Sequence, residues 1–184
     1  LANWFETLCF KIEIQCVDAE LKKYNMLATL GSGPGGLILS GHTDTVPCNI
    51  ERWNSDPFTL TDKDNKFYGL GSCDMKGFFP LVLAAVEKVD ASKLKSPIFI
   101  LATSDEETSM AGARALATLG LPKARAAIIG EPTGLRPINM HKGIMMEGVR
   151  ITGQAGHSSN PDLGNNAMEA INTVISELMS YRAE

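Results

Sequence analysis

Leu37-Ile38-Leu39-Ser40-Gly41-His42-Thr43-Asp44 is the most informative stretch of this chain. Its leading apolar residues predict a buried strand, which gives way to small residues and a His-x-Asp pair. Two positions apart on an extended chain, His42 and Asp44 would lie on the same side. A zinc-ligating histidine needs this arrangement, because a nearby oxygen acceptor normally holds its second ring nitrogen. We therefore take His42 and Asp44 as the first candidate site residues.

The segments around this strand predict an α/β fold. Further strands are predicted where apolar residues alternate with polar ones or run continuously, at 10–16, 24–30, 97–102 and 126–130. Apolar residues at helical spacing predict helices over 78–89, expected to be well buried, and over 109–119. Strands that alternate with helices favour a mostly parallel mixed sheet that is flanked by helices.

The glycine-rich segment 31–36 reads Gly-Ser-Gly-Pro-Gly-Gly and matches the G-x-G-x-x-G spacing of dinucleotide-binding loops. A phosphate-binding loop must open a helix, yet the residues that follow predict a strand. We therefore interpret 31–36 as a hairpin turn. A second hairpin is predicted by 58–61 and 66–69, which flank the turn-forming sequence Asp-Lys-Asp-Asn.

The character of the sequence changes near Gly143. Residues 145–152 predict a strand, and a loop rich in Gly, Ser, Asn and Pro then leads into a helix predicted over 166–181. We place a domain boundary near Gly143. The chain starts at Leu1 rather than methionine and stops within the last predicted helix, so we expect it to be truncated at both ends.

Composition argues against several classes of function. Seventeen Lys and Arg against 21 Asp and Glu give a net charge of −4, and no basic block occurs, so nucleic acid and anionic membrane surfaces are poor partners. No apolar run is long enough for a membrane span, and no basic leader precedes an apolar segment. Four cysteines without a C-x-x-C pair favour a reducing, cytoplasmic location.

Three further carboxylate groups stand in settings like that of His42. Asp74 precedes the first predicted helix, Glu106 and Glu107 follow the strand 97–102, and Glu131 follows the next strand. The carboxyl ends of strands are where open α/β sheets place their functional groups. One imidazole and several carboxylates that converge there would suit two zinc-like divalent ions with nitrogen and oxygen ligands.

Each group also has an ordinary structural explanation. Asp74 could cap a helix, Glu106 and Glu107 could be first-turn acids that the helix dipole favours, and Glu131 could belong to a turn. His42 could be a structural histidine. Because four such coincidences at comparable positions would be needed, we prefer the interpretation as a metal centre.

These motifs resemble those of the dinuclear-zinc amidohydrolases, which include aminoacylases, carboxypeptidase G and succinyl-diaminopimelate desuccinylase. The segments that carry the resemblance are GHTDTVP (41–47), GLGSCDMKG (69–77), DEE (105–107) and GEPT (130–133). The acetylornithine deacetylases are the more similar members, through RW (52–53), DPFTLT (56–61), ILAT (100–103), EETSMAGAR (106–114) and GHSS (156–159). The resemblance spans essentially the whole chain.

The resemblance implies a role for each candidate ligand. His42 would ligate one metal ion, and Asp44 would orient its imidazole. Asp74 would bridge two ions, zinc in the first instance or cobalt. Glu107 would ligate the second ion, and Glu131 would complete the protein ligands of the first.

The catalytic residues that the resemblance implies are Glu106 and His157. Glu106 would be the general base that takes a proton from the attacking water. His157 would reach across a homodimer and help to polarise the scissile carbonyl. Residues 1–143 would then form an incomplete catalytic metal-binding domain, and 144–184 the beginning of a lid or dimerisation domain.

The activity implied is hydrolysis of the acetyl amide of N2-acetyl-L-ornithine, a small-molecule substrate, to L-ornithine and acetate in arginine biosynthesis. One alternative is a deacylase for another N-acyl amino acid, such as succinyl-diaminopimelate. A second alternative is an inactive metal-binding fragment, because the family carries another ligating histidine for which this stretch offers no counterpart.

Overall fold

The computed structural model describes residues 1–183. Contacts divide the chain into two compact units, Leu1–Pro137 and Ile138–Glu184, and each is described by itself. The division lies close to the boundary expected near Gly143. The catalytic role of the first part and the lid role of the second stay predictions.

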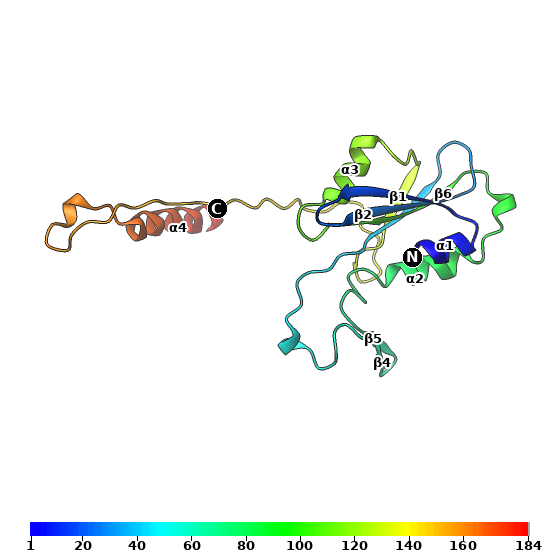
Figure 1. Ribbon diagram of the computed structural model, residues 1–184, viewed down its shortest axis with the longest axis horizontal. Coiled ribbons are helices and arrows are strands. Elements are labelled where there is room, and N and C mark those ends of the chain that lie inside the picture. Colours follow the sequence, from blue (N-terminus) through cyan, green and yellow to red (C-terminus); the bar gives the residue numbers. More distant parts are fainter. Residues whose placement is uncertain (184) are drawn as a thin grey trace. The chain divides into compact units, whose positions relative to one another are not determined.

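The first unit is built on a five-stranded sheet with the order β1-β2-β6-β3-β7 (Figure 1). Its strands are β1 (Lys11–Asp18), β2 (Lys23–Leu30), β3 (Leu37–His42), β6 (Ile98–Thr103) and β7 (Ala126–Ile129). The pairs β1–β2 and β2–β6 are antiparallel, whereas β3 runs parallel to both β6 and β7. A mixed sheet flanked by helices is thus confirmed, with its parallel part around β3.

The interpretation of segment 31–36 as a hairpin turn is wrong. Strands β2 and β3 are not neighbours, because β6 lies between them and its Ile98 is opposite both Leu30 and Leu37. The apolar run of β6 is buried by neighbours on both sides, and this favours the central position. No helix follows the glycines, since β3 begins at Leu37. The rejection of a phosphate-binding loop is therefore supported.

Helices cover both faces of the sheet. In Figure 1, α1 (Ala2–Thr7) and α2 (Phe78–Val86) lie on one side, and α3 (Ala111–Leu119) lies on the other. Helix α2 was expected to be well buried, but Leu81 is 70% exposed, so only one face of the helix packs on the sheet. The main core joins that face to α1, β2 and β6 through Phe5, Phe10, Met26, Ala28, Leu30, Phe79, Val82, Val86, Ile100 and Ala102.

A separate hairpin precedes α2. It consists of β4 (Thr61–Lys63) and β5 (Lys66–Tyr68), which pair in antiparallel fashion. Asp64 and Asn65 form the turn with φ angles of 54° and 58°, a left-handed conformation that these two residue types tolerate better than most. The second predicted hairpin is confirmed, although its strands are shorter. Two short 3-10 helices, Ile50–Arg52 and Ala91–Lys93, lie in the remaining connections.

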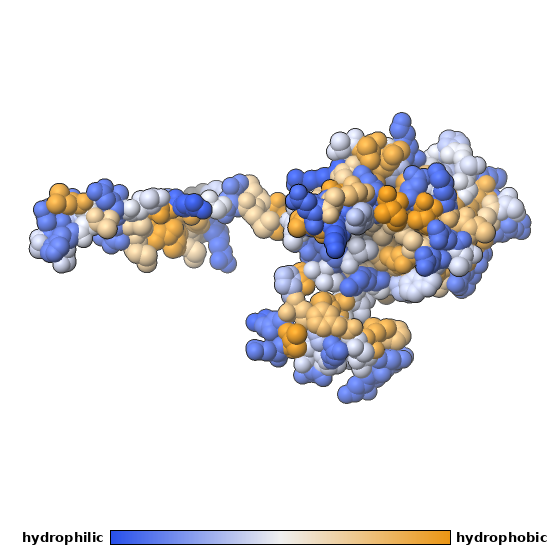
Figure 2. All heavy atoms as spheres, in the orientation of Figure 1, coloured by the Kyte–Doolittle hydropathy of each residue, from blue (hydrophilic) through white to orange (hydrophobic). Residues whose placement is uncertain are grey.

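The second unit holds α4 (Ala167–Ala183) and a 3-10 helix, Pro161–Leu163. The helix expected over 166–181 is confirmed, but the strand expected over 145–152 does not form. A strand requires a partner, and within residues 1–183 the only pairing in this unit is the isolated bridge between Gln154 and Asn165. Apolar surface remains uncovered on this unit (Figure 2), and along α4 it comes from Met168, Ile175, Leu178 and Met179.

Across the part of the chain that the structure describes, no helix combines the length and apolarity that a membrane span requires.

Candidate metal centre

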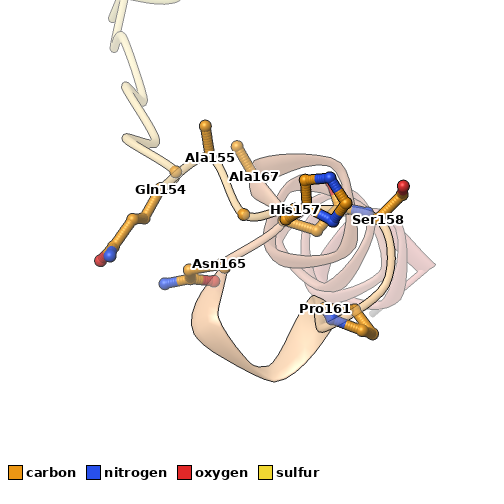
Figure 3. A pocket seen from close by; sticks show the side chains of 11 residues that line it. Gln154, Ala155, His157, Ser158, Pro161, Asn165 and Ala167 are labelled. Carbon is orange, nitrogen blue, oxygen red and sulfur yellow. The ribbon is translucent and has the colours of Figure 1, made fainter.

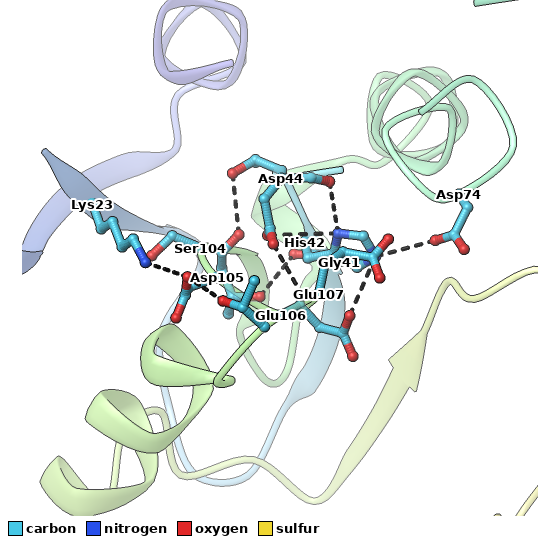
Figure 4. A network of polar contacts seen from close by, with 12 residues as sticks. Lys23, Gly41, His42, Asp44, Asp74, Ser104, Asp105, Glu106 and Glu107 are labelled. Atoms are coloured by element: carbon cyan, nitrogen blue, oxygen red, sulfur yellow. Dashed lines mark hydrogen bonds and ion pairs between the residues drawn. The ribbon is translucent and has the colours of Figure 1, made fainter. Parts of the chain in front are cut away.

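The carboxyl ends of three parallel strands meet at one edge of the sheet. Because β3 lies between β6 and β7, His42 at the end of β3 is flanked by the residues that follow the other two strands. Glu106 and Glu107 come from the turn after β6, and Glu131 comes from the turn after β7. Asp74 approaches from the segment that precedes α2 (Figure 4). The structure thus brings together the residues that the motifs singled out.

His42 lies at the middle of this group. Its side chain is only 1% exposed, and its Nε2 atom faces carboxylates from three segments of the chain. The Nε2 atom lies 3.2 Å from Oδ1 of Asp74, 3.8 Å from Oε2 of Glu106 and 3.8 Å from Oε1 of Glu131. A buried imidazole surrounded in this way is not an ordinary core histidine.

The other ring nitrogen fixes the orientation of His42. Its Nδ1 atom lies 3.0 Å from the backbone carbonyl oxygen of Asp44. A carbonyl oxygen can only accept, so Nδ1 carries the hydrogen and donates it. In the neutral imidazole, Nε2 then presents its lone pair to the carboxylate-lined space. This is the tautomer that ligation through Nε2 requires.

Asp44 also contributes its side chain. Its Oδ2 atom accepts a hydrogen bond of 3.0 Å from the backbone N–H of Glu107. Its Oδ1 atom is buried, has no hydrogen-bond partner among residues 1–183 and lies 3.6 Å from Nδ1 of His42. The sequence predicted that Asp44 orients His42, and in the structure the backbone oxygen of Asp44 makes the shorter contact.

The donor set fits a divalent metal ion. His42, Asp74 and Glu107 each offer one ligand atom, and these three atoms lie within 4.8 Å of one another. One imidazole nitrogen with carboxylate oxygens is a ligand set that zinc accepts. The buried, unpartnered Asp44 oxygen beside the imidazole adds negative potential that a cation would offset. Glu106 and Glu131 lie at the border of this group, within 3.8 Å of His42.

Electrostatics in the group favour a cation as well. Burial alone would lower the pKa of His42, but the Asp44 carbonyl and the charges of Glu131, Asp44 and Glu106 outweigh it and raise the pKa. Burial raises the pKa of Glu107, and the nearby Asp74 charge raises it further. Burial is also the main cause of the raised pKa of Glu131. Carboxylates crowded in this way would be stabilised by a positive ion.

The ordinary structural explanations do not account for Asp74, Glu106 and Glu107. The residue at the N-cap of α2 is Gly77, and no side chain caps that helix, so Asp74 has no capping role. Helix α3 begins at Ala111 with no acidic residue in its first turn. Glu106 and Glu107 therefore do not interact with the dipole of α3 as first-turn residues.

His157 belongs to the second unit. It lines a hollow of about 430 Å³ together with Gln154, Ala155, Pro161 and Asn165 (Figure 3). Its Nδ1 atom accepts a hydrogen bond of 3.2 Å from the backbone N–H of Ser159 and lies 2.7 Å from the hydroxyl oxygen of the same residue. In the neutral ring, Nε2 then carries the hydrogen and is a potential donor. Its catalytic role stays a prediction.

Asp105, Lys23 and Asn25, to which the sequence assigned no role, lie beside the Glu106–Glu107 turn. Asp105 is 6% exposed and accepts hydrogen bonds from Lys23, Thr108 and Ser109. Asn25, which is 1% exposed, bonds to Ser104. Nothing in the local sequence around Lys23 or Asn25 points to this turn, because the connection arises from the pairing of β2 with β6.

Sequence comparison identifies relatives of the kind that the motifs indicate. Acetylornithine deacetylase of Proteus mirabilis is 57% identical over 182 residues, which cover 99% of this chain and 47% of that relative. The acetylornithine deacetylase of Photorhabdus laumondii is 54% identical over 182 residues, which cover 99% of this chain and 47% of that relative. The chain therefore spans about half the length of these curated relatives.

The fold is shared with a solved structure, and a family model identifies the family. A crystal structure of an aminopeptidase from Bacillus cereus matches with a TM-score of 0.64 at 18% identity, over 95% of this chain and 48% of that one. At this identity, the likeness supports the fold alone. The model of peptidase family M20/M25/M40 matches residues 38–183. The chain accordingly belongs to peptidase family M20/M25/M40.

Proposed function

We propose that this chain supplies the metal centre of an amide hydrolase that removes the acetyl group from N2-acetyl-L-ornithine, giving L-ornithine and acetate. The observation that carries the proposal is the buried Nε2 atom of His42, which faces Asp74, Glu106 and Glu131 at the ends of parallel strands. The choice of substrate is supported by the two relatives that are 54% and 57% identical and are named acetylornithine deacetylase.

The proposed ligands are His42, Asp74, Glu107 and Glu131, with Asp74 shared between two divalent ions, zinc or cobalt. Bound zinc would polarise the amide carbonyl and lower the pKa of a water molecule. Asp44 holds His42 through its backbone oxygen and the Glu107 loop through Oδ2. Its part would be to hold His42 and Glu107, which come from neighbouring strands, in fixed positions relative to each other.

Glu106 is the proposed general base. Its side chain is 34% exposed, so water and substrate can reach it, and its Oε2 atom lies 3.8 Å from Nε2 of His42. A carboxylate in this position would accept a proton from the attacking water and pass it to the nitrogen of the departing amine. It would act beside the metal ligands without having to be one of them.

The substrate would enter a cavity of about 420 Å³ that opens beside Asp74 and Glu107. Small-molecule sites typically have volumes of roughly 300–1,000 Å³ and mostly apolar walls. Apolar side chains of the wall are Val46, Trp53 and Leu70. A small N-acetyl amino acid would place its amide at the carboxylate end and its acetyl methyl group against apolar side chains of the wall.

The wider setting forms part of the same proposal. The enzyme would act in arginine biosynthesis in the cytoplasm as a homodimer, with residues 1–143 in the catalytic domain and 144–184 in the lid or dimerisation domain. His157 would donate its Nε2 hydrogen to the carbonyl oxygen of a substrate bound in the partner subunit. The hydrogen bonds from Ser159 to Nδ1 support this tautomer.

The test is a substrate panel with the whole protein loaded with zinc or cobalt. We expect ornithine release from N2-acetyl-L-ornithine to exceed the hydrolysis of succinyl-diaminopimelate. Faster hydrolysis of the succinyl compound would refute the substrate assignment, and bound metal without any acyl release would favour a metal-binding fragment.

The proposed base is tested by Glu106→Gln, which we expect to abolish turnover while the metal content stays unchanged. Glu87→Gln, at an exposed position after α2, is the matched control and should keep full activity. Retained turnover in Glu106→Gln would exclude Glu106 as the base.

A further inference from the structure

We infer that Lys23 and Asn25 of β2 are positioning residues that hold the loop 104–110 and thereby set where Glu106 and Glu107 stand in the metal centre. The inference rests on the proposed roles of Glu106 and Glu107. Neither Lys23 nor Asn25 belongs to the group around His42, so both would act through the loop.

The topology places these two residues beside the loop. Strands β2 and β6 are antiparallel, with Met26 opposite Ala102. The residues that precede Met26 therefore lie beside those that follow Ala102, which lead into the loop. Lys23 and Asn25 are two positions apart, so their side chains project from the same face of β2.

Asn25 ties Ser104, the first residue of the loop, to Gly112 in α3, just beyond the end of the loop. Its Oδ1 atom accepts a hydrogen bond from the backbone N–H of Ser104 at 3.1 Å, and the Ser104 hydroxyl lies 3.4 Å away. Its Nδ2 atom donates to the backbone oxygen of Gly112 and to Oε1 of Gln15, both at 2.9 Å. Both donor hydrogens of this buried amide are satisfied, which is characteristic of a structural polar group.

Gly112 packs closely against Asn25 and Ser104. A Cβ atom on Gly112 would lie 2.4 Å from Oδ1 of Asn25 and 2.4 Å from the backbone oxygen of Ser104. The backbone N–H of Gly112 also donates to that Ser104 oxygen, at 3.1 Å. Ser104 and Gly112 are thus joined to each other as well as to Asn25, and the loop begins and ends at a fixed point.

Lys23 holds the loop near its start, through Asp105 (Figure 4). The Asp105 side chain is 6% exposed and that of Lys23 is 30% exposed, so the ion pair is partly shielded from water. Asp105 also accepts hydrogen bonds from the hydroxyl groups of Thr108 and Ser109. Its backbone oxygen accepts from Met110, which closes the loop on itself.

The two residues that carry the proposed chemistry directly follow this anchored aspartate. The side chains of Glu106 and Glu107 face His42. The loop itself is held by the contacts of Ser104 and Asp105 and by the hydrogen bond from the backbone N–H of Glu107 to Asp44. Loss of the Lys23 ammonium would leave the Asp105 charge without its cation, close to other carboxylates. The loop would then be free to shift, and the ligand atom of Glu107 would shift with it.

The test compares Co²⁺ binding by the whole protein with and without Lys23→Met. Chelator competition gives the affinity, and the visible spectrum of bound Co²⁺ reports the ligand geometry. Replacing a group that supports a ligand typically weakens metal binding by roughly 10–100-fold, and we expect a loss in this range together with an altered spectrum. Lys23→Arg, which keeps the cation, should restore most of the affinity.

The matched control is Lys11→Met, which removes an exposed ion pair with Glu13 elsewhere in the sheet and should leave Co²⁺ binding unchanged. Asp105→Asn is the second variant, because it keeps the shape of the side chain and removes its charge; a smaller loss is expected. Wild-type affinity and spectrum in Lys23→Met would overturn the inference, as would an equal loss in Lys11→Met.

These measurements use no substrate. If the whole protein does not hydrolyse N2-acetyl-L-ornithine, the proposed function fails, while the Co²⁺ measurements still decide whether Lys23 positions the loop. Conversely, wild-type Co²⁺ binding in Lys23→Met alongside full deacetylation would overturn the positioning role and leave the proposed function intact.

Discussion

The backbone N–H of Glu107 donates a hydrogen bond of 3.0 Å to Oδ2 of Asp44. This bond joins the turn after β6 to the segment after β3. The carbonyl oxygen of the same aspartate holds Nδ1 of His42 at 3.0 Å. One residue therefore supports two proposed metal ligands that come from neighbouring strands.

Asp44→Ala should weaken zinc binding by roughly 10–100-fold, in the range observed when groups that orient metal ligands are removed. The backbone contact to His42 would persist, but the Glu107 turn would lose its acceptor. Competition with a chromogenic chelator measures the loss. Asp44→Asn keeps an oxygen that can accept from Glu107 and should retain more affinity. Asp62→Ala, at an exposed position on β4, is the control, and equal zinc affinity in all three variants would contradict this role.

Asp74→Ala should release more metal than any other single change in the group. Its Oδ1 atom makes the shortest contact with Nε2 of His42, at 3.2 Å, and it is the ligand proposed to serve both ions. The metal content after dialysis measures the effect, and we expect less than one bound ion per chain. Because Asp74 is 54% exposed, the metal-free variant should fold as the parent does. Two retained ions would rule out the bridging role.

The stability of the metal-free protein should fall as the pH rises from about 5 to about 8. The pKa values of His42, Glu107 and Glu131 are all raised in the folded chain. Groups of this kind stabilise the fold below their unfolded pKa values, and this contribution is lost as the pH rises through the folded values. Urea unfolding at several pH values, followed by tryptophan fluorescence, measures the trend.

Asp105 does not disturb this window. Lys23 and two hydroxyl groups hold its pKa below the ordinary value of 3.8, so its contribution to stability is complete above that value and is lost only in acid.

Saturating zinc should remove the decline of stability with rising pH, because the metal requires the deprotonated forms of its ligands. A metal-free stability that stays level or rises from about pH 5 to about pH 8 would contradict the proton balance inferred for this group.

Local patterns were sufficient to locate most strands and the candidate ligands. The apolar run that ends in His42 and the apolar runs before Glu106 and Glu131 each form a strand, and the rule that functional groups gather at carboxyl ends brings them together. Asp74 follows no such run, and only its motif pointed to the site.

Pairing between distant segments could not be predicted in the same way. The insertion of β6 between β2 and β3 depends on contacts between residues far apart in the sequence. The local pattern of segment 31–36 therefore indicates a hairpin turn that the structure does not have. The apolar pattern of 145–152 indicates a strand but supplies no partner for it. The link from Lys23 and Asn25 to the Glu106–Glu107 loop likewise exists only once β2 pairs with β6.

Gly36→Ala tests the packing of the connection from β2 to β3 against the start of β6, which the local pattern does not predict. Gly36 has a φ of +114°, and a Cβ atom there would lie 2.4 Å from the backbone oxygen of Pro97. That oxygen also accepts the N–H of Leu37 at 3.0 Å, at the start of β3. The added methyl group would therefore push β3 away from β6, and with it the strand that carries His42.

The matched control for this change is Gly134→Ala. Gly134 also has a positive φ, +64°, but a Cβ atom there would meet nothing within 4 Å. The control carries only the conformational cost of a left-handed residue, about 1 kcal/mol. Gly36→Ala should lower the unfolding free energy by roughly 1–3 kcal/mol more, as is typical when a packed site is overfilled. If both variants lose the same unfolding free energy in urea, the backbone at Pro97 moves without cost and the connection from β2 to β3 is not tightly packed.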